Sequence, residues 1–142
     1  MDKIAVVYWS GTGNTEAMAD KIVEGIESAG AACDKYFVTD FPMDKVDDYA
    51  KFAFGCPSMG SEVLEEGEFE PFFTDIEGKL SGKKVALFGS YGWGDGEWMR
   101  DWEDRVRDAG ATLYDEGLII NETPDADGEQ ECVDHGKGFA NF

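Results

Sequence analysis

The sequence is poor in cysteine, in proline and above all in positive charge. Its 142 residues contain three cysteines, four prolines and 12 lysines or arginines, against 31 aspartates and glutamates. Cys33, Cys56 and Cys132 are an odd number without Cys-x-x-Cys spacing, which indicates reduced thiols rather than a disulfide framework, with a metal or redox pair as the alternative. No apolar stretch approaches the about 18 residues of a membrane span, and the apolar run near Met1 is too short for a signal peptide. We therefore expect a cytoplasmic protein without membrane insertion.

The missing positive charge leaves a formal net charge of −19. Such a chain would repel nucleic acids and anionic membranes, which excludes both as partners. Basic protein partners are favoured, and acidity that serves only solubility is the alternative. No linker, repeat or low-complexity tract divides the chain, so we expect a single domain over residues 1–142.

Apolar strand patterns alternate with helical patterns along the chain. Strands are expected at Lys3–Trp9, Ala32–Val38, Phe52–Cys56, Lys84–Ser90 and Thr112–Ile120. Helices are expected from Thr15 to about Gly30, across Phe69–Leu80, across Met99–Ala109 and from about Asp127 to Ala140. The first strand is apolar at almost every position, as in strands that are buried on both faces. The alternation predicts an α/β protein with a doubly wound parallel sheet between two helical layers, and such sheets bind ligands beyond the carboxyl ends of their strands.

The loop after the first strand has the composition of a phosphate-binding loop. Residues 10–15 read Ser-Gly-Thr-Gly-Asn-Thr, which supplies hydroxyls, an amide and two glycines that let the backbone fold close around an anion. The loop opens the first helix, whose N–H groups and partial positive charge attract phosphate. It is not a Walker A loop, because Glu16 and Ala17 stand where Gly-Lys is needed. It is not the dinucleotide fingerprint either, because Glu16 replaces the third glycine.

The loops after the third and fourth strands each place a large side chain among glycines. Met59 precedes Gly60, and Trp93 lies between Gly92 and Gly94. An exposed side chain of this kind is unfavourable unless it stacks on something, and the alternative is that either residue belongs to the core. Beside a phosphate loop, the two residues predict a flat aromatic ring held between them.

The first strand, loop and helix together carry a known pattern, in the residues Val6, Val7, Tyr8, Ser10, Gly13, Thr15, Ala19 and Ile22. These residues fit the flavodoxin signature at every position. The Met59-Gly60 and Tyr91-Gly92-Trp93-Gly94 loops resemble those of short-chain bacterial flavodoxins, and the likeness extends over essentially the whole chain. The resemblance implies a three-layer, five-stranded flavodoxin-like fold with strand order 2-1-3-4-5. An uninterrupted fifth strand is expected, as in the short-chain type.

The resemblance also implies a non-covalent FMN. Its phosphate would lie on residues 10–15 and its isoalloxazine ring between Met59 and Trp93, while Glu62 matches the carboxylate that accepts a hydrogen bond from flavin N3–H. The cofactor-binding residues expected on this basis are Ser10, Gly11, Thr12, Gly13, Asn14, Thr15, Pro57, Ser58, Met59, Gly60, Ser61, Glu62, Ser90, Tyr91, Gly92, Trp93, Gly94, Asp95 and Asn121.

Finer contacts follow from the same resemblance. Backbone N–H groups of Tyr91–Gly94 would face flavin N1 and O2, and Asn121 matches a ribityl contact. The carbonyl of Gly60 would turn toward N5–H and stabilise the neutral semiquinone. Pro57 departs from family members that carry a serine there to bind the phosphate.

The implied function is a low-potential one-electron carrier that shuttles between semiquinone and hydroquinone in place of ferredoxin. Residues 4–20, 53–77 and 86–98 contain no lysine or arginine. A phosphate held only by neutral dipoles stays negative and opposes the second reduction. Partners would be ferredoxin-type donors and acceptors that dock basic surfaces near the flavin edge of a monomer. The acidic residues of Glu62–Glu70 either steer these partners or form a solvated helix face.

One enzymatic alternative stays open, and no catalytic residue or metal ligand is expected in the favoured interpretation. An FMN-dependent reductase of quinones or small oxidants needs room for a substrate over the ring, and Trp93 as a lid argues against it. A phosphorylated signalling receiver would need acidic residues where Ser10-Gly11 and Gly55-Cys56 stand.

The C-terminal segment carries two further expectations. His135 is the only histidine and is expected on the surface or at a helix end. The segment that begins at Thr123 resembles a calcium loop, but Thr123 takes the place of the first aspartate. Asp125 or Asp127 is therefore expected to cap the last helix instead.

Overall fold

A parallel β-sheet forms the middle layer of the computed structural model, which describes residues 1–142. Its strands are β1 (Ile4–Tyr8), β2 (Cys33–Phe37), β3 (Lys51–Gly55), β4 (Lys84–Tyr91), β5 (Thr112–Leu113) and β6 (Leu118–Asn121). They lie in the order β2-β1-β3-β4-β5, and β6 also pairs with β4. The predicted doubly wound topology and strand order are confirmed.

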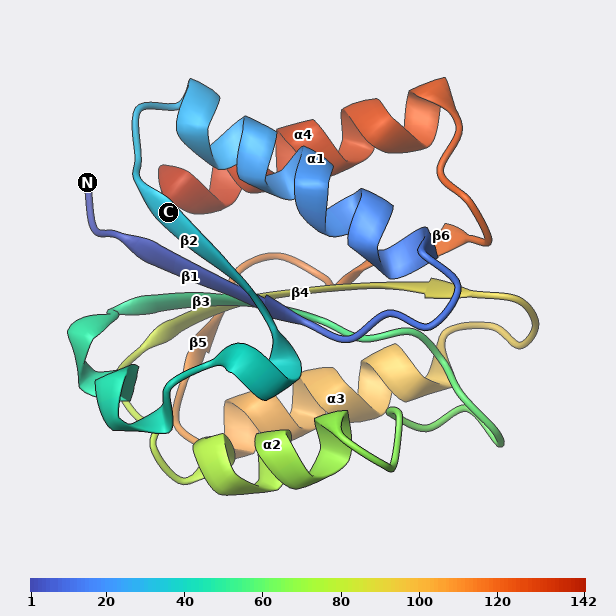
Figure 1. Cartoon of the computed structure of the whole chain (residues 1–142), viewed down its shortest axis with the longest axis horizontal. Helices are drawn as coiled ribbons and strands as arrows, with labels where there is room; N and C mark the ends of the chain where they lie inside the picture. Colours follow the sequence, from blue (N-terminus) through green and yellow to red (C-terminus); the bar gives the residue numbers. More distant parts are fainter.

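Helices cover both faces of the sheet (Figure 1). They are α1 (Asn14–Ser28), α2 (Phe69–Glu77), α3 (Glu97–Asp108) and α4 (Ala126–Ala140), with short 3-10 helices at η1 (Val38–Asp40) and η2 (Met43–Asp48). The helices α1 and α4 lie on one face, and α2 and α3 lie on the other. The three-layer arrangement is therefore the one that the alternating pattern predicts.

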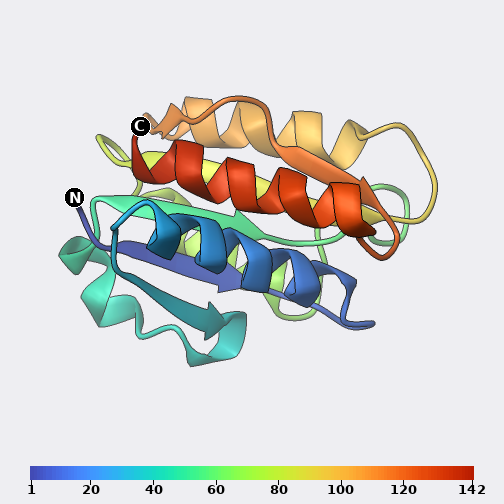
Figure 2. The ribbon, with the colours of Figure 1, turned by 90° about the horizontal axis from the view of Figure 1, so that it is seen from above.

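The helices α1 and α4 lie side by side and require glycine where they meet (Figure 2). A Cβ on Gly25 of α1 would overlap the carbonyl oxygen of Val133, and a Cβ on Gly136 of α4 would overlap that of Ile22. Both helices start at the carboxyl end of the sheet (Figure 1). Their close packing therefore fixes two helix starts at the edge where a ligand would bind.

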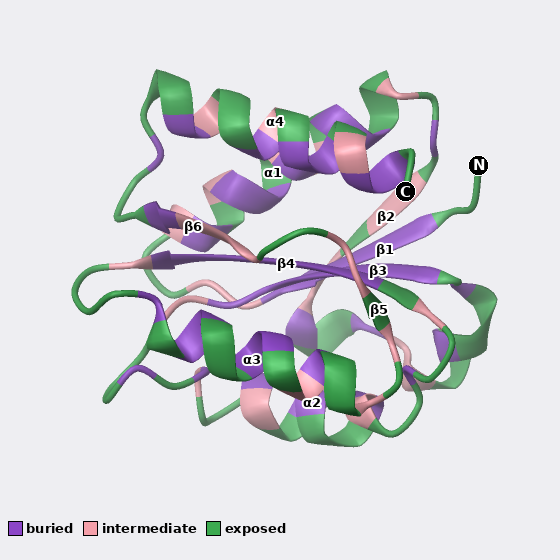
Figure 3. Ribbon diagram, turned by 180° about the vertical axis from the view of Figure 1, so that it is seen from behind, coloured by how far each residue is buried: buried purple, intermediate pink, exposed green.

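The central strands are buried because helices cover them on both sides (Figure 3). Along β1, Val6 packs with the core on the α1 and α4 side, whereas Val7 packs with the core on the α2 and α3 side. The second of these cores is rich in aromatic rings that are less than 2% exposed, namely Phe52, Phe54, Phe69, Phe73, Trp98 and Trp102. The prediction that the first strand is buried on both faces is confirmed.

The predicted uninterrupted fifth strand is wrong. β5 pairs with the start of β4, with Lys84 opposite Thr112, and β6 pairs with its end, with Phe88 opposite Leu118. Residues 114–117 lie between the two strands and include Asp115 at a φ of 51°. The Glu103 carboxylate accepts a hydrogen bond from the N–H of Gly117 at 2.6 Å. The N–H of Tyr114 still donates to the carbonyl of Val85 in β4, and the contact of Gly117 with α3 accompanies the break that follows.

The predicted surface position of His135 is also wrong. The side chain is only 8% exposed, and its Nε2 lies 3.2 Å from the carbonyl oxygen of Leu87 in β4. Its ring packs against that of Tyr114, with the centroids 5.3 Å apart. Burial lowers the pKa of His135, because desolvation outweighs the hydrogen bond with Leu87. The histidine therefore belongs to the interface between α4 and the sheet.

The prediction that Asp125 or Asp127 caps the last helix is confirmed for Asp125. Asp125 is the N-cap of α4 and accepts a hydrogen bond from the N–H of Gly128 at 2.8 Å. The cysteines are unpaired, and no group of histidine, cysteine, aspartate and glutamate side chains is placed to hold a metal ion. None of the helices has the length and apolar character needed to cross a bilayer.

Candidate functional site

A cleft of about 360 Å³ opens at the carboxyl ends of β1, β3 and β4. Small-molecule clefts commonly have volumes of about 300–1,000 Å³. The lining residues are Trp9, Gly11, Thr12, Asn14, Pro57, Ser58, Met59, Ser90, Tyr91, Gly92, Glu122 and Thr123. The three loops singled out in the sequence therefore meet at one site.

The predicted site residues fall into two groups. Those that line the cleft are Gly11, Thr12, Asn14, Pro57, Ser58, Met59, Ser90, Tyr91 and Gly92. Those that lie in the same loops or at the end of β6 without lining it are Ser10, Gly13, Thr15, Gly60, Ser61, Glu62, Trp93, Gly94, Asp95 and Asn121. The role of each as a cofactor contact stays a prediction.

Three lining residues were missed, namely Trp9, Glu122 and Thr123. Trp9 stands directly before the glycine-rich loop, and this position was the signal that it lines the site, where it also packs against the edge of the core. Glu122 and Thr123 follow β6, whose carboxyl end reaches the same sheet edge as the other loops. Glu122 has a φ of 56°, and its N–H donates to the carbonyl of Tyr91 at 2.8 Å.

The first loop wraps around the hydroxyl of Ser10. The Ser10 Oγ accepts hydrogen bonds from the N–H groups of Gly13 and Glu16, both at 3.2 Å. Gly13 is the N-cap of α1 at a φ of 97°, a left-handed conformation that favours glycine, and it supplies no side-chain cap. Ser10 therefore caps the helix from upstream and leaves the turn open to the cleft.

The hydroxyl of Thr15 lies inside the protein rather than in the cleft. Thr15 and Ser90 are 1% and 5% exposed, and their Oγ atoms lie 3.0 Å apart. The N–H of Ser90 also donates to the Thr15 hydroxyl at 3.4 Å. This pair ties the start of α1 to the end of β4 and so fixes the first loop against the third.

Two further side-chain contacts fix the walls of the cleft. The indole N–H of Trp9 donates to Glu68 at 3.0 Å, across 59 residues of sequence. The Trp9 ring lies over Gly11, where a Cβ would come within 2.8 Å of Cη2. On the opposite side, the hydroxyl of Thr123 donates to Oδ1 of Asn14 at 2.8 Å.

The second loop is a tight hairpin that carries Met59. Met59 and Val63 exchange backbone hydrogen bonds of 2.8 and 2.9 Å, and the turn between them includes Gly60 at a φ of 51° and Glu62 at 56°. Met59 is 39% exposed at the cleft. The structure therefore rules out the alternative that Met59 is a core residue.

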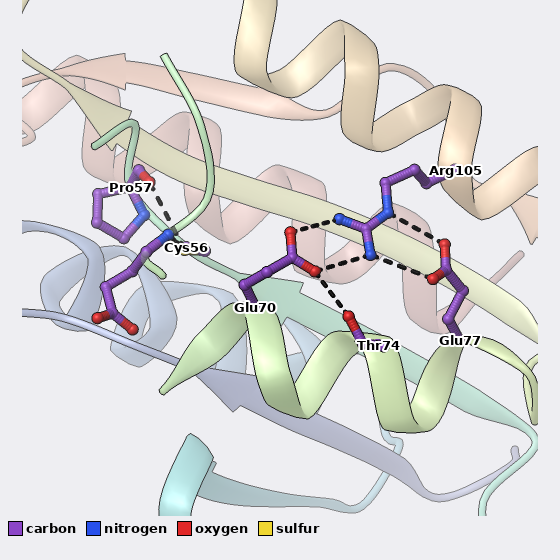
Figure 4. Close-up of polar contacts among 7 residues, drawn as sticks. Cys56, Pro57, Glu70, Thr74, Glu77 and Arg105 are labelled. Carbon is purple, nitrogen blue, oxygen red and sulfur yellow. Dashed lines mark hydrogen bonds and ion pairs between the residues drawn. The ribbon is translucent and has the colours of Figure 1, made fainter. Parts of the chain in front are cut away.

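The base of this hairpin is held by the buried Cys56 (Figure 4). The Cys56 Sγ accepts a hydrogen bond from the N–H of Glu65 at 3.3 Å. Burial raises the pKa of the Cys56 thiol, so the group stays neutral. The Glu65 carboxylate accepts from three N–H groups at the start of α2, those of Gly67, Glu68 and Phe69, each at 2.8 Å. These contacts fix the hairpin relative to α2.

The third loop carries Trp93, which is 64% exposed and is therefore not a core residue. Gly94 and Gly96 have φ values of 87° and 97°. A Cβ on Gly94 would overlap the carboxylate of Glu62, which accepts a hydrogen bond from the N–H of Gly96 at 3.3 Å. Glu62 thus links the second loop to the third and is only 8% exposed.

No lysine or arginine lines the cleft. Arg100, near the third loop, binds both the carbonyl and the carboxylate of Asp95, each at 3.0 Å. Arg105 in α3 is held by Glu70 and Glu77 of α2 through four hydrogen bonds (Figure 4). The Arg105 guanidinium lowers the pKa of the Glu70 carboxyl. These cations are therefore paired with carboxylates outside the cleft.

The donor set suits an anionic group attached to a flat, largely apolar one. Hydroxyl-bearing residues of the loops and Asn14 line the cleft, and so do the larger side chains of Met59 and Tyr91. A Cβ added to Gly92 meets nothing within 4 Å, so the backbone there is open to a ligand. A phosphate bound to an aromatic ring fits these residues.

Comparison with known proteins agrees with this chemistry. The family model described as Flavodoxin matches residues 6–136. The chain belongs to the flavodoxin family. This flavodoxin is 51% identical to the flavodoxin of Clostridium beijerinckii over 137 residues, which cover 96% of this chain and 99% of that protein. It is 50% identical to the flavodoxin of Megasphaera elsdenii, with 96% and 98% covered.

Solved flavodoxin structures have the same fold. The solution structure of two-electron reduced Megasphaera elsdenii flavodoxin has a TM-score of 0.89 and 48% sequence identity, and the match covers 98% of this chain and 99% of that one. A flavodoxin from the domain Archaea has a TM-score of 0.88 and 31% identity. Flavodoxins carry a flavin and transfer electrons between redox partners, so this flavodoxin is an electron-transfer protein rather than an enzyme.

Proposed function

We propose that this flavodoxin is a low-potential one-electron carrier that binds FMN without a covalent bond. The observation that carries the proposal is the cleft itself, which is lined by hydroxyls and the Asn14 amide, with Glu122 as its one carboxylate and no lysine or arginine. The first loop supplies these donors from residues 10–15, and the exposed side chains of Met59 and Trp93 are available to cover the two faces of the ring.

The proposed contacts of the flavin ring follow the loops. The carboxylate of Glu62 accepts a hydrogen bond from N3–H, and backbone N–H groups of Tyr91–Gly94 face N1 and O2. Asn121 contacts the ribityl chain, although its Nδ2 also donates to the carbonyl of Tyr91 at 3.2 Å. The left-handed Gly60 supports a turn whose carbonyl is presented to N5 in the half-reduced flavin.

The absence of cations in the cleft lowers the reduction potential that we expect for the bound flavin. A unit charge ~10 Å away opposes a second negative charge by about 0.4 kcal/mol at a dielectric constant near 80, and by more in a less polar site. One-electron potentials shift by about 59 mV for each 1.4 kcal/mol. Several uncompensated charges around the ring therefore lower the potential of the semiquinone–hydroquinone couple by on the order of 100 mV.

The proposed partners are ferredoxin-type donors and acceptors with basic surfaces. Acidic side chains near the cleft, including Glu65, Glu66, Glu68 and Glu122, would attract such surfaces and accelerate encounter at low salt. The carrier is proposed to act as a monomer, because electron exchange needs only one exposed flavin edge.

The test is a visible spectrum of the purified protein during stepwise reduction. We expect a yellow oxidised form, a blue neutral semiquinone as the intermediate and a colourless end point, with FMN recovered after denaturation. A protein that stays colourless after incubation with FMN contradicts the proposal. Steady-state reduction of quinones by NAD(P)H with the protein alone would favour the reductase alternative.

A further inference from the structure

Binding of a phosphate in the cleft depends on which protein groups donate hydrogen bonds. Phosphate oxygens only accept, so each contact needs a donor from the protein. In the first loop, the Ser10 Oγ accepts from two backbone N–H groups and keeps its O–H as a donor, whereas the Thr15 hydroxyl is paired with Ser90 inside the protein. Asn14, the first residue of α1, lines the cleft with a side chain that is only half-buried.

An asparagine side chain carries two polar groups, one that donates hydrogen bonds and one that accepts them. Its NH₂ offers two donors to a phosphate, whereas its carbonyl oxygen would repel one. The Asn14 Oδ1 accepts a hydrogen bond from the hydroxyl of Thr123 at 2.8 Å, across 109 residues of sequence. Because Oδ1 is occupied there, the two N–H bonds of Nδ2 are left for other partners.

Thr123 itself is held in place by the segment around it. The preceding Glu122 is in the left-handed region, and its N–H donates to the carbonyl of Tyr91 at 2.8 Å. Pro124 and the α4 N-cap Asp125 follow directly. The Thr123 hydroxyl is therefore presented to Asn14 from a backbone anchored to both β4 and α4.

We propose that Thr123 is a positioning residue that orients the Asn14 amide so that its NH₂ faces the phosphate. The inference rests on the proposed FMN function and adds to it a source of selectivity for a phosphorylated flavin over riboflavin. In a loop without cations, the orientation of a neutral amide decides whether that side chain attracts or repels the ligand. The role belongs to the hydroxyl of Thr123, because its methyl group has no donor.

The test compares Thr123→Val, which keeps the shape and removes the donor, with Thr123→Ser, which keeps the donor. Dissociation constants of FMN and of riboflavin are measured by quenching of flavin fluorescence on the apoprotein, after circular dichroism has shown that each variant is folded. One lost hydrogen bond predicts a Kd for FMN about 3- to 10-fold higher in Thr123→Val. Riboflavin affinity is expected to be unchanged, and Thr123→Ser is expected to match the unsubstituted protein for both ligands.

A spectroscopic measurement separates orientation from general loosening of the loop. The side-chain amide of Asn14 is observed in ¹⁵N–¹H spectra of the apoprotein and assigned with Asn14→Asp. We expect Thr123→Val to shift these two signals and move them closer to those of a freely rotating amide. Thr123→Ser is expected to leave them in place.

The outcomes are distinct. Failure of the unsubstituted protein to bind FMN overturns the proposed function. If it binds FMN and Thr123→Val binds equally well, only the role of Thr123 is overturned. The same conclusion follows if riboflavin affinity falls as much as FMN affinity, or if Thr123→Ser does not restore binding.

Discussion

The helix ends at the two edges of the sheet contact different groups: lysines at the amino ends of the strands, and no cation at the carboxyl ends. At the amino ends of β3 and β4, the buried Lys51 donates to the carbonyls of Phe139 and Ala140 at 3.2 and 3.1 Å, and Lys84 donates to that of Phe142 at 2.9 Å. Cations thus neutralise the carbonyl end of α4. At the carboxyl ends, the start of α1 meets hydroxyls, amides and the carboxylate of Glu16, but no cation.

This difference shows that positive charge is excluded locally rather than absent from the fold. The chain places a lysine in an almost fully buried position, with Lys51 only 4% exposed, where a helix end needs it for stability. It places none where a lysine would neutralise a bound phosphate. The predictions below remove charge from the first end, add charge to the second, or replace an uncharged side chain at one of them.

The largest expected effect is loss of stability in Lys51→Met, which keeps the packing volume and removes the cation. Two carbonyls at the end of α4 lose their buried partner, which is expected to lower the free energy of unfolding by about 2–3 kcal/mol. Urea denaturation of the apoprotein measures this free energy of unfolding. Lys84→Met is the control, because its amine donates to Phe142, just beyond α4, in an exposed position, and its loss should stay below about 1 kcal/mol. Equal effects would contradict the importance of burial.

The next largest effect is on FMN binding at the carboxyl ends of the strands, where we propose that an aromatic side chain rather than a cation holds the ligand. Trp93→Ala should weaken FMN binding by about 1–3 kcal/mol, because an exposed ring would no longer stack on the flavin. Trp93→Phe is the control and should recover part of the loss. Titration of the apoprotein with FMN gives both values, and an unchanged affinity in Trp93→Ala would remove Trp93 from the site.

Adding a cation to the cleft gives a smaller but directional change. In Thr12→Lys, a charge ~10 Å from the ring at a dielectric constant of about 40 contributes about 0.8 kcal/mol, which raises the potential of the second reduction by roughly 35 mV. Thr12→Gln adds a neutral side chain and should leave the potential within ~10 mV. Potentiometric titration at low and high salt checks the cause, since a shift that does not shrink at high salt is not electrostatic in origin.

The smallest effect comes from His135, a buried residue of α4 that faces the sheet with the carboxylate of Asp115 as a nearby charge, and it sharpens the comparison with Lys51. Its pKa is lowered from 6.5, so the unfolded chain binds a proton first as the pH falls. The full contribution of the neutral ring is present above about pH 6.5 and decreases as the pH falls toward the folded-state pKa. Unfolding free energies across about pH 5 to 7 should fall more steeply for the unsubstituted protein than for His135→Gln. Parallel curves for the two proteins would exclude His135 as the source.

The comparison also explains what could be predicted from the sequence. The strand order was predicted from the resemblance to flavodoxins. The burial of β1 and the three loops follow from local patterns, because a strand covered on both faces is apolar at nearly every position. The exposure of Trp93 follows from the glycines around it. These features depend on residues that are close together along the chain.

The features that were missed depend on contacts between distant segments. The break between β5 and β6 requires the carboxylate of Glu103, and the burial of His135 requires Leu87 from β4. Trp9 and Thr123 enter the site because Glu68 and Asn14 meet them across 59 and 109 residues. The pattern of residues within one segment cannot predict such contacts with distant segments.

The glycine contact between α1 and α4 has a consequence for the speed of electron transfer. Because backbone packs against backbone at Gly25 and Gly136, we expect α1 and α4 to move little relative to each other. Asn14 is the first residue of α1, and Thr123 lies just before the start of α4. A change of charge in the cleft therefore meets a frame that cannot relax far. We therefore expect little nuclear rearrangement of the protein to accompany each electron, which would favour rapid exchange with a docked partner.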